Sequence, residues 1–130
     1  PLKIASHFAD LDEETAAANA YERARELYLK LMSEQYNEGV RLMAEEYYIR
    51  SLTDEGRWEE AAERLLTLPG KYPDYHRFRE NHLMAASIYE SELDDPERAA
   101  ATLEECIDLY PGSALAEEAA RQLERIRSGD

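Results

Sequence analysis

The chain of 130 residues contains few of the residues that interrupt helices, with only five glycines and five prolines. Its single cysteine, Cys106, excludes a disulfide within the chain and a zinc site built from several cysteines. No apolar run approaches the roughly 20 residues that cross a bilayer, and no basic region followed by an apolar stretch opens the sequence. We therefore expect neither a membrane anchor nor a signal peptide in it. Because the first residue is Pro1 rather than Met, we expect the chain to be part of a longer protein, which leaves any upstream anchor open.

Basic residues are also scarce, since 15 Lys and Arg stand against 29 Asp and Glu, for a formal charge of −14. This charge repels phosphate backbones, and no stripe of Lys and Arg overrides it, so we expect no binding to nucleic acid. A basic protein or peptide would be a partner of complementary charge. Solvated, glutamate-rich helix faces explain the same acidity without any partner.

The abundant residues, Ala, Leu, Glu and Arg, are strong helix formers and predict an all-α protein. Gly56 can supply the left-handed turn that ends a helix, and Asp95 followed by Pro96 is typical of a helix start. Apolar spacing between such signals predicts about seven helices. We expect them at about residues 2–9, 13–33, 38–53, 57 to 68–70, 75–93, 96–109 and 113–126.

One segment of the sequence occurs twice. Residues 61–65, closed by Tyr72-Pro73, return as residues 99–103, closed by Tyr110-Pro111, with each matched pair 38 residues apart. A period in this range indicates stacked helical hairpins. Because each hairpin buries its apolar face only against its neighbours, the repeat predicts an extended scaffold with a groove rather than a compact catalytic domain.

The two copies resemble the tetratricopeptide repeat, a helical hairpin of about 34 residues. The positions that carry the resemblance are Gly56, Ala61, Leu65 and Pro73 in the first copy and Ala86, Tyr89, Ala99, Leu103, Cys106 and Pro111 in the second. Small residues among them allow neighbouring helices to approach to about 8–10 Å. The sequence departs from the family where Tyr48 or Ile49 stands at a position that usually holds a small residue, and the period is longer than the family's.

The resemblance implies a right-handed superhelical array of antiparallel helix hairpins, an α-solenoid. We expect one such domain over residues 1–130, with an irregular N-terminal hairpin (1–37), two repeats (38–74 and 75–111) and a capping helix (112–130). The Tyr110-Pro111 pair before an Ala-rich helix is similar to bacterial cell-envelope members of this class. Cytoplasmic arrays share the pair, so the periplasm or cell envelope and the cytoplasm both remain open.

In arrays of this family the first helix of each hairpin lines the concave side, where a peptide or protein partner binds. The corresponding positions here are Met43, Tyr47, Arg50, Asp54, Glu80, Leu83, Met84 and Ser87. An alternative interpretation makes Tyr47 and Met84 part of the core between repeats. The lysine- and asparagine-based clamp that some members use for a C-terminal carboxylate is not reproduced, since Glu46 and Arg50 occupy that neighbourhood.

No set of residues predicts catalysis or a cofactor. His76 and His82 are six positions apart, which places them on different faces of a helix and excludes a shared metal. Cys106 is in helical register with Ala99 and Leu103, which favours a buried thiol over a nucleophile. We therefore predict no catalytic residue, no metal site and no cofactor.

The sequence hypothesis is a non-enzymatic scaffold that binds a peptide or protein partner in a concave helical groove. Two alternatives remain open. One is a structural module that associates with itself as a homo-oligomer, and the other is a regulatory domain of a larger enzyme or envelope-assembly protein.

Overall fold

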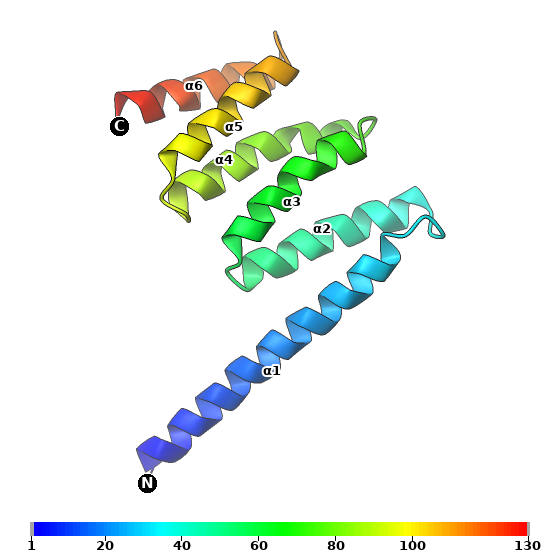
Figure 1. The fold of residues 1–130 in the computed structure, drawn as a ribbon, viewed down its shortest axis with the longest axis vertical. Helices are drawn as coiled ribbons and strands as arrows, with labels where there is room; N and C mark the ends of the chain where they lie inside the picture. Colours follow the sequence, from blue (N-terminus) through cyan, green and yellow to red (C-terminus); the bar gives the residue numbers. More distant parts are fainter. Residues whose placement is uncertain (1, 130) are drawn as a thin grey trace. The chain divides into compact units, whose positions relative to one another are not determined.

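The computed structural model of the chain describes the backbone of residues 2–129 and the side chains of residues 13–129. All of its regular elements are helices, and no strand occurs among the described residues, so the all-α prediction is confirmed. The elements, shown in Figure 1, are α1 (Leu2–Leu31), α2 (Glu38–Asp54), α3 (Trp58–Lys71), the 3-10 helix η1 (His76–Glu80), α4 (Asn81–Ser91), α5 (Pro96–Leu109) and α6 (Ala114–Ser128).

The N-terminal region differs from our expectation. The predicted helices at 2–9 and 13–33 form one continuous helix, α1, so that the described chain has six α-helices and residues 1–37 hold no hairpin of their own. The physical reason is the absence of a breaker, because no glycine or proline occurs between Pro1 and Gly39. The predicted helix at 75–93 is also divided, since it opens with the tighter turn η1 before α4 begins.

Helix α3 continues through Pro69 to Lys71, one residue beyond the predicted end near residues 68–70. Proline has no N–H, so Pro69 leaves the carbonyl of Leu65, four residues earlier, without its helical donor. The side-chain amide of Asn81, the first residue of α4, donates a hydrogen bond to that carbonyl at 3.0 Å. A tertiary hydrogen bond thus replaces the one that proline removes, and it also joins α3 to α4.

The chain divides into two compact units, Pro1–Gly56 (unit 1) and Arg57–Asp130 (unit 2). Within unit 1, α1 and α2 pack as an antiparallel hairpin. Within unit 2, α3, α4, α5 and α6 each pack antiparallel to the next helix, as Figure 1 shows.

The core of unit 2 contains many small residues at these helix contacts. Ala61, Ala85 and Ala99 are completely buried, and so are Leu103 and Cys106 on α5. Of the ten positions that carry the family resemblance, the structure buries Ala61, Leu65, Ala86, Tyr89, Ala99, Leu103 and Cys106, whereas Gly56, Pro73 and Pro111 are exposed in turns. Gly56 has φ +77°, a conformation that favours glycine.

Candidate functional site

Four of the predicted partner-binding residues form one exposed stripe on α2. Met43, Tyr47, Arg50 and Asp54 follow one another at spacings of four, three and four residues, so they lie on one face of the helix. All four side chains are exposed, and Met43 and Tyr47 keep 44% and 42% of their surface open to solvent. We call this set the α2 stripe. Since Tyr47 is this exposed, it is not the core residue of the alternative interpretation.

The ring of Tyr47 is held in place although it is exposed. It stacks on Tyr28 of α1, with ring centroids 5.8 Å apart and planes 23° from parallel. The guanidinium carbon of Arg50 lies 5.6 Å from the centroid of the Tyr47 ring, a cation–π distance. Tyr28, Tyr47 and Arg50 therefore form an ordered platform of two rings and one cation within unit 1.

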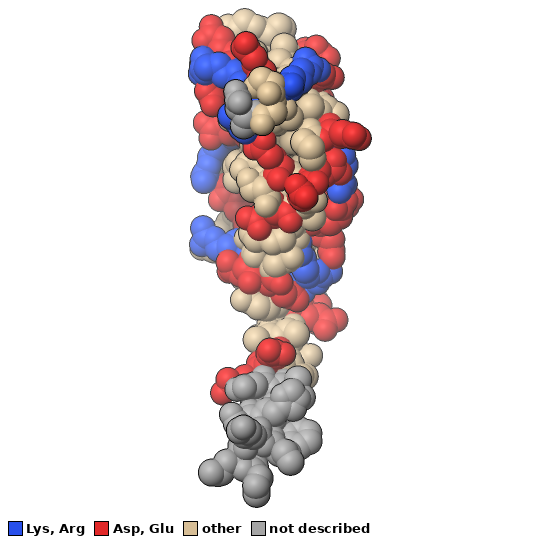
Figure 2. All heavy atoms as spheres, turned by 90° about the vertical axis from the view of Figure 1, so that its left-hand side faces the viewer, with Lys and Arg blue, Asp and Glu red and all other residues tan. Residues whose placement is uncertain are grey.

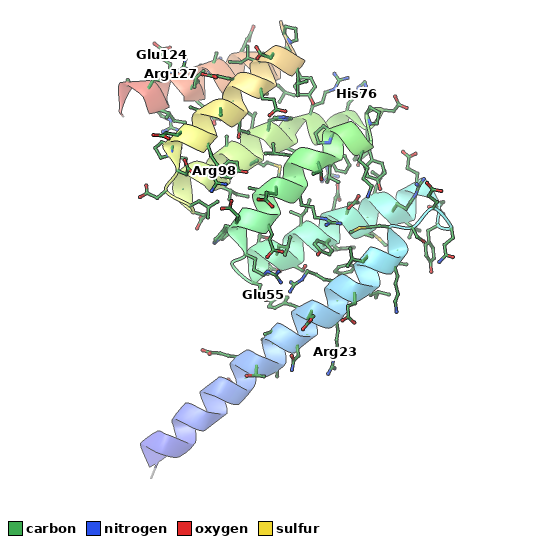
Figure 3. The ribbon with its side chains drawn as sticks, viewed as in Figure 1. Arg23, Glu55, His76, Arg98, Glu124 and Arg127 are labelled. Atoms are coloured by element: carbon green, nitrogen blue, oxygen red, sulfur yellow. The ribbon has the colours of Figure 1, made fainter. Side chains whose placement is uncertain are left out.

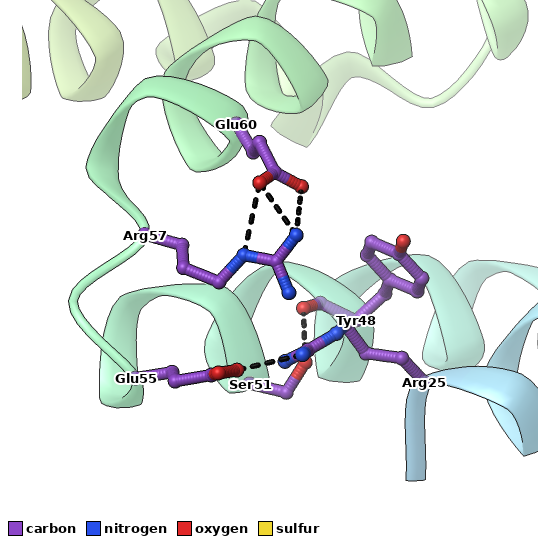
Figure 4. A network of polar contacts seen from close by, with 6 residues as sticks. All are labelled: Arg25, Tyr48, Ser51, Glu55, Arg57 and Glu60. Carbon is purple, nitrogen blue, oxygen red and sulfur yellow. Dashed lines mark hydrogen bonds and ion pairs between the residues drawn. The ribbon is translucent and has the colours of Figure 1, made fainter. Parts of the chain in front are cut away.

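A polar network near the end of α2 fixes α1 against it (Figure 4). Arg25 of α1 is almost fully buried, and its Nη2 donates to Glu55 Oε1 at 2.6 Å. The hydroxyl of Ser51 donates to the carbonyl of Tyr48 at 2.6 Å. An ion pair shielded from water is screened less than one on the surface, so this pair helps to set how α1, and with it Tyr28, lies against α2.

The other four predicted residues belong to unit 2. Met84 on α4 is half exposed, Ser87 is exposed on the same helix, and Leu83 is partly buried. Glu80 is exposed but is the last residue of η1 rather than a residue of α4. These residues form a second surface of mixed chemistry, on unit 2.

The two histidines and the cysteine singled out in the sequence differ in their exposure to solvent. His76 is exposed in η1, whereas His82 is buried in α4 with its Nε2 3.5 Å from Glu105 Oε1. Burial raises the pKa of the Cys106 thiol, which disfavours the reactive thiolate. No group of three or more potential metal ligands occurs among the side chains of residues 13–129. Across residues 2–129, no helix is both long and apolar enough to span a membrane.

One polar cluster of unit 2 escaped the sequence analysis. Arg98 of α5 donates to both oxygens of Glu59 on α3, one of them at 2.8 Å, and to Asp95 at 2.7 Å, while its guanidinium lies 4.6 Å from the centroid of the Tyr89 ring. The hydrogen bonds from Arg98 lower the pKa of both carboxyl groups. Of these contacts, only the one between Asp95 and Arg98 could be inferred from sequence, because the two residues are three positions apart at the start of a helix. The Glu59 contact joins equivalent helices of successive hairpins.

Antiparallel helices that stack in succession through buried alanines, as in unit 2, define a helical-repeat protein. Within it, residues 80–113 match the sequence model of the tetratricopeptide repeat family. The matched span covers α4, α5 and the following turn and is as long as one repeat of that family. The chain therefore carries a tetratricopeptide repeat in unit 2, as the sequence predicted. No curated protein and no solved structure matches the chain.

Proposed function

We propose that the chain is a non-enzymatic scaffold whose α2 stripe binds a peptide or a peptide-like segment of a partner protein. Tetratricopeptide repeats mediate contacts between proteins, and one of them lies in unit 2. The observation that carries the proposal is the platform of Tyr28, Tyr47 and Arg50, in which Tyr47 and Arg50 are exposed. It presents the two side-chain types, Tyr and Arg, that most often dominate binding energy at interfaces.

The geometry of the platform favours binding because little order has to be gained. An exposed Arg or Tyr normally loses side-chain entropy when a partner immobilises it, at about 0.5–1.5 kcal/mol per side chain. Here Tyr47 already stacks on Tyr28, and Arg50 already lies over the Tyr47 ring. Met43, one turn before Tyr47, adds an exposed, flexible apolar group that adapts to different partner side chains.

The partner we propose has apolar and basic character. Acidic side chains outnumber basic ones on the described part of the face shown in Figure 2, in keeping with the net charge of −14. Asp54 ends the α2 stripe, and Glu80 is exposed in unit 2. An apolar partner residue would contact Met43 and Tyr47, and a basic residue about two helical turns further along would meet Asp54.

Affinity measurements on matched variants test this proposal. A partner is first isolated on the immobilised chain, and its binding is then measured by calorimetry. We expect Tyr47→Ala/Arg50→Ala to lose about 2 kcal/mol or more of binding free energy, because both anchors are removed. The control, Leu109→Ala/Arg121→Ala, also removes one exposed apolar and one exposed Arg side chain, but from unit 2. Equal affinities for the two variants, with helicity intact in both, would contradict the proposal.

A further inference from the structure

A line of side chains on α1 continues the α2 stripe across the hairpin of unit 1. Ala24, Tyr28 and Leu31 follow one another at spacings of four and three residues, so they lie on one face of α1. The α2 stripe has the same spacing around Tyr47, whose ring stacks on that of Tyr28. Because α1 and α2 are antiparallel neighbours, the two lines run side by side (Figure 1). We call the two lines together the hairpin face.

The hairpin face has a half-buried middle and exposed apolar edges. Ala24, Tyr28 and Leu31 are each half-buried. Leu27, three residues after Ala24 and four before Leu31, borders this line on α1 and is 54% exposed. Met43 is 44% exposed on the α2 stripe. Exposed large apolar groups that lie together on an ordered surface mark a contact for another molecule.

The chemistry of the hairpin face favours a helical occupant over an extended one. An extended peptide carries an N–H and a C=O group on each residue, and these groups need partners when they leave water. The backbone groups within α1 and α2 are paired inside their own helices, and neither line of the hairpin face contains Asn, Gln, Ser or Thr. An α-helix pairs its own backbone and presents only side chains. It can therefore cover this apolar surface without burying unpaired polar groups.

We propose that the hairpin face binds an amphipathic α-helix of a partner protein, which packs against α1 and α2 together. This inference rests on the proposed function and names the form of its partner. The small side chain of Ala24 allows a third helix to approach to about 8–10 Å, and the partner's apolar residues recur every three or four positions. Asp54 is exposed at the last residue of α2, whereas Glu55, labelled in Figure 3, is held by Arg25. Asp54 attracts the positive N-terminal end of the bound helix, which therefore runs antiparallel to α2.

Two peptide libraries with the same randomised residues test the form of the partner. In one library a covalent bridge between positions i and i+4 holds each peptide helical. In the other the peptides are linear and carry proline at about every fifth position, which prevents a helix. Both libraries are selected on the whole immobilised chain, and the affinities of the selected peptides are measured by calorimetry. We expect the helical peptides to bind roughly tenfold more tightly or better, with apolar residues at helical spacing. Equal or tighter binding by the proline peptides, or no binder from the helical library, would overturn the proposal.

Two leucines of α1 provide matched variants that locate the bound helix. Leu27→Gln removes an exposed apolar group at the edge of the hairpin face, whereas Leu29→Gln removes a similarly exposed one from another side of α1. The selected helical peptides should lose affinity roughly tenfold or more with Leu27→Gln and less than about twofold with Leu29→Gln. Equal losses with the two variants would contradict the assigned face. Dimers of the chain that Leu27→Gln dissociates would assign the face to a second copy and overturn the partner helix.

The variant Tyr47→Ala/Arg50→Ala separates this inference from the proposed function. Loss of helical-peptide binding with both this variant and Leu27→Gln supports the two claims together. Proline peptides that require Tyr47 and Arg50 but not Leu27 would overturn the helical partner and leave the α2 stripe as a binding site. Helical peptides that require Leu27 but neither Tyr47 nor Arg50 would instead overturn the proposed role of the α2 stripe.

Discussion

The two units of the chain use alanine and apolar surface in opposite ways. Among the side chains of residues 13–129, seven of the eight buried alanines belong to unit 2, where they lie at contacts between successive helices. Of the six exposed large apolar side chains in the same described range, four belong to unit 1, namely Leu27, Leu29, Met43 and Tyr47. Small buried residues permit the close helix packing of a repeat. Exposed apolar groups, in contrast, mark either a contact surface for another molecule or a tendency to aggregate. The difference suggests that stacking and recognition are divided between the units.

Buried charge reinforces the contrast. Unit 1 buries Arg25 and Glu45, and Arg25 is paired with Glu55. Unit 2 buries the polar side chains of Asn81, His82 and Thr102, but its ion pairs lie at the surface, as between Arg98 and Glu59. Buried ion pairs contribute little net stability but penalise alternative arrangements strongly, because an unpaired charge would remain inside. In unit 1 this fixes the orientation of the platform of Tyr28, Tyr47 and Arg50, and in unit 2 apolar packing provides the stability.

The largest effect should come from the core of unit 2. Leu103 on α5 is completely buried, so Leu103→Ala should destabilise the fold by about 2–5 kcal/mol through lost burial and a residual cavity. Leu109 lies on the same helix and is 52% exposed, so Leu109→Ala should cost far less. Urea unfolding followed by circular dichroism measures both. Similar losses for the two variants would mean that the stated face of α5 is not the core.

Overpacking tests the same helix contact from the other direction. Ala99 is completely buried, and Ala99→Leu should cost about 1–3 kcal/mol because the neighbouring helices cannot move apart without loss of contact. Ala101, two residues further on, is exposed, so Ala101→Leu adds the same atoms without a clash. Thermal unfolding of the pair separates packing from helix propensity. An unchanged melting temperature for Ala99→Leu would contradict the close contact.

A smaller effect on stability is expected for the platform in unit 1. Tyr47→Ala removes a stacked but exposed ring, and we expect it to cost about 1 kcal/mol or less. The comparison with Leu103→Ala under the same unfolding conditions is what matters. If Tyr47→Ala destabilises the chain as strongly as Leu103→Ala, then Tyr47 belongs to the core and the division between stacking and recognition fails.

The smallest effect concerns the surface cluster around Arg98 and should depend on pH. Hydrogen bonds from Arg98 lower the pKa of Glu59 and Asp95 in the folded chain, so the unfolded chain binds more protons in acid. The stabilisation is therefore complete above the ordinary glutamate pKa of 4.5 and is lost as the pH falls below it. Arg98→Gln should lower the urea midpoint slightly at pH 7 but not at pH 3, and the difference at pH 7 should shrink in about 1 M salt. A difference that is independent of pH would rule out the ion pairs as its cause.

Much of the architecture could be predicted from sequence because the repeat is local. Equal spacing of Ala61 and Ala99 from their Tyr-Pro turns predicted the hairpins, and residues 80–113 match the family. The continuous α1 was missed because the sequence offers no positive signal for an uninterrupted helix. The end of α3 was predicted to within about one residue, but the hydrogen bond from Asn81 that supports the helix around Pro69 was not, because Asn81 is distant in sequence.

The candidate site was predicted less completely. Helical spacing sufficed to place Met43, Tyr47, Arg50 and Asp54 on one face of α2. Spacing could not predict that Tyr28 of α1 stacks on Tyr47, since that contact depends on how the two helices pack. The pairing of Arg98 with Glu59 was missed for the same reason. Contacts between helices, unlike faces of one helix, require the tertiary arrangement.

Site-specific photo-crosslinking tests most directly whether recognition belongs to unit 1. A photoreactive amino acid is placed either at Met43, on the α2 stripe, or at Leu109, an equally exposed apolar position of unit 2. After addition of the isolated partner and illumination, we predict a covalent complex from position 43 and little or none from position 109. Crosslinking from position 109 alone, with both variants folded, would contradict the assignment of the binding surface to α2.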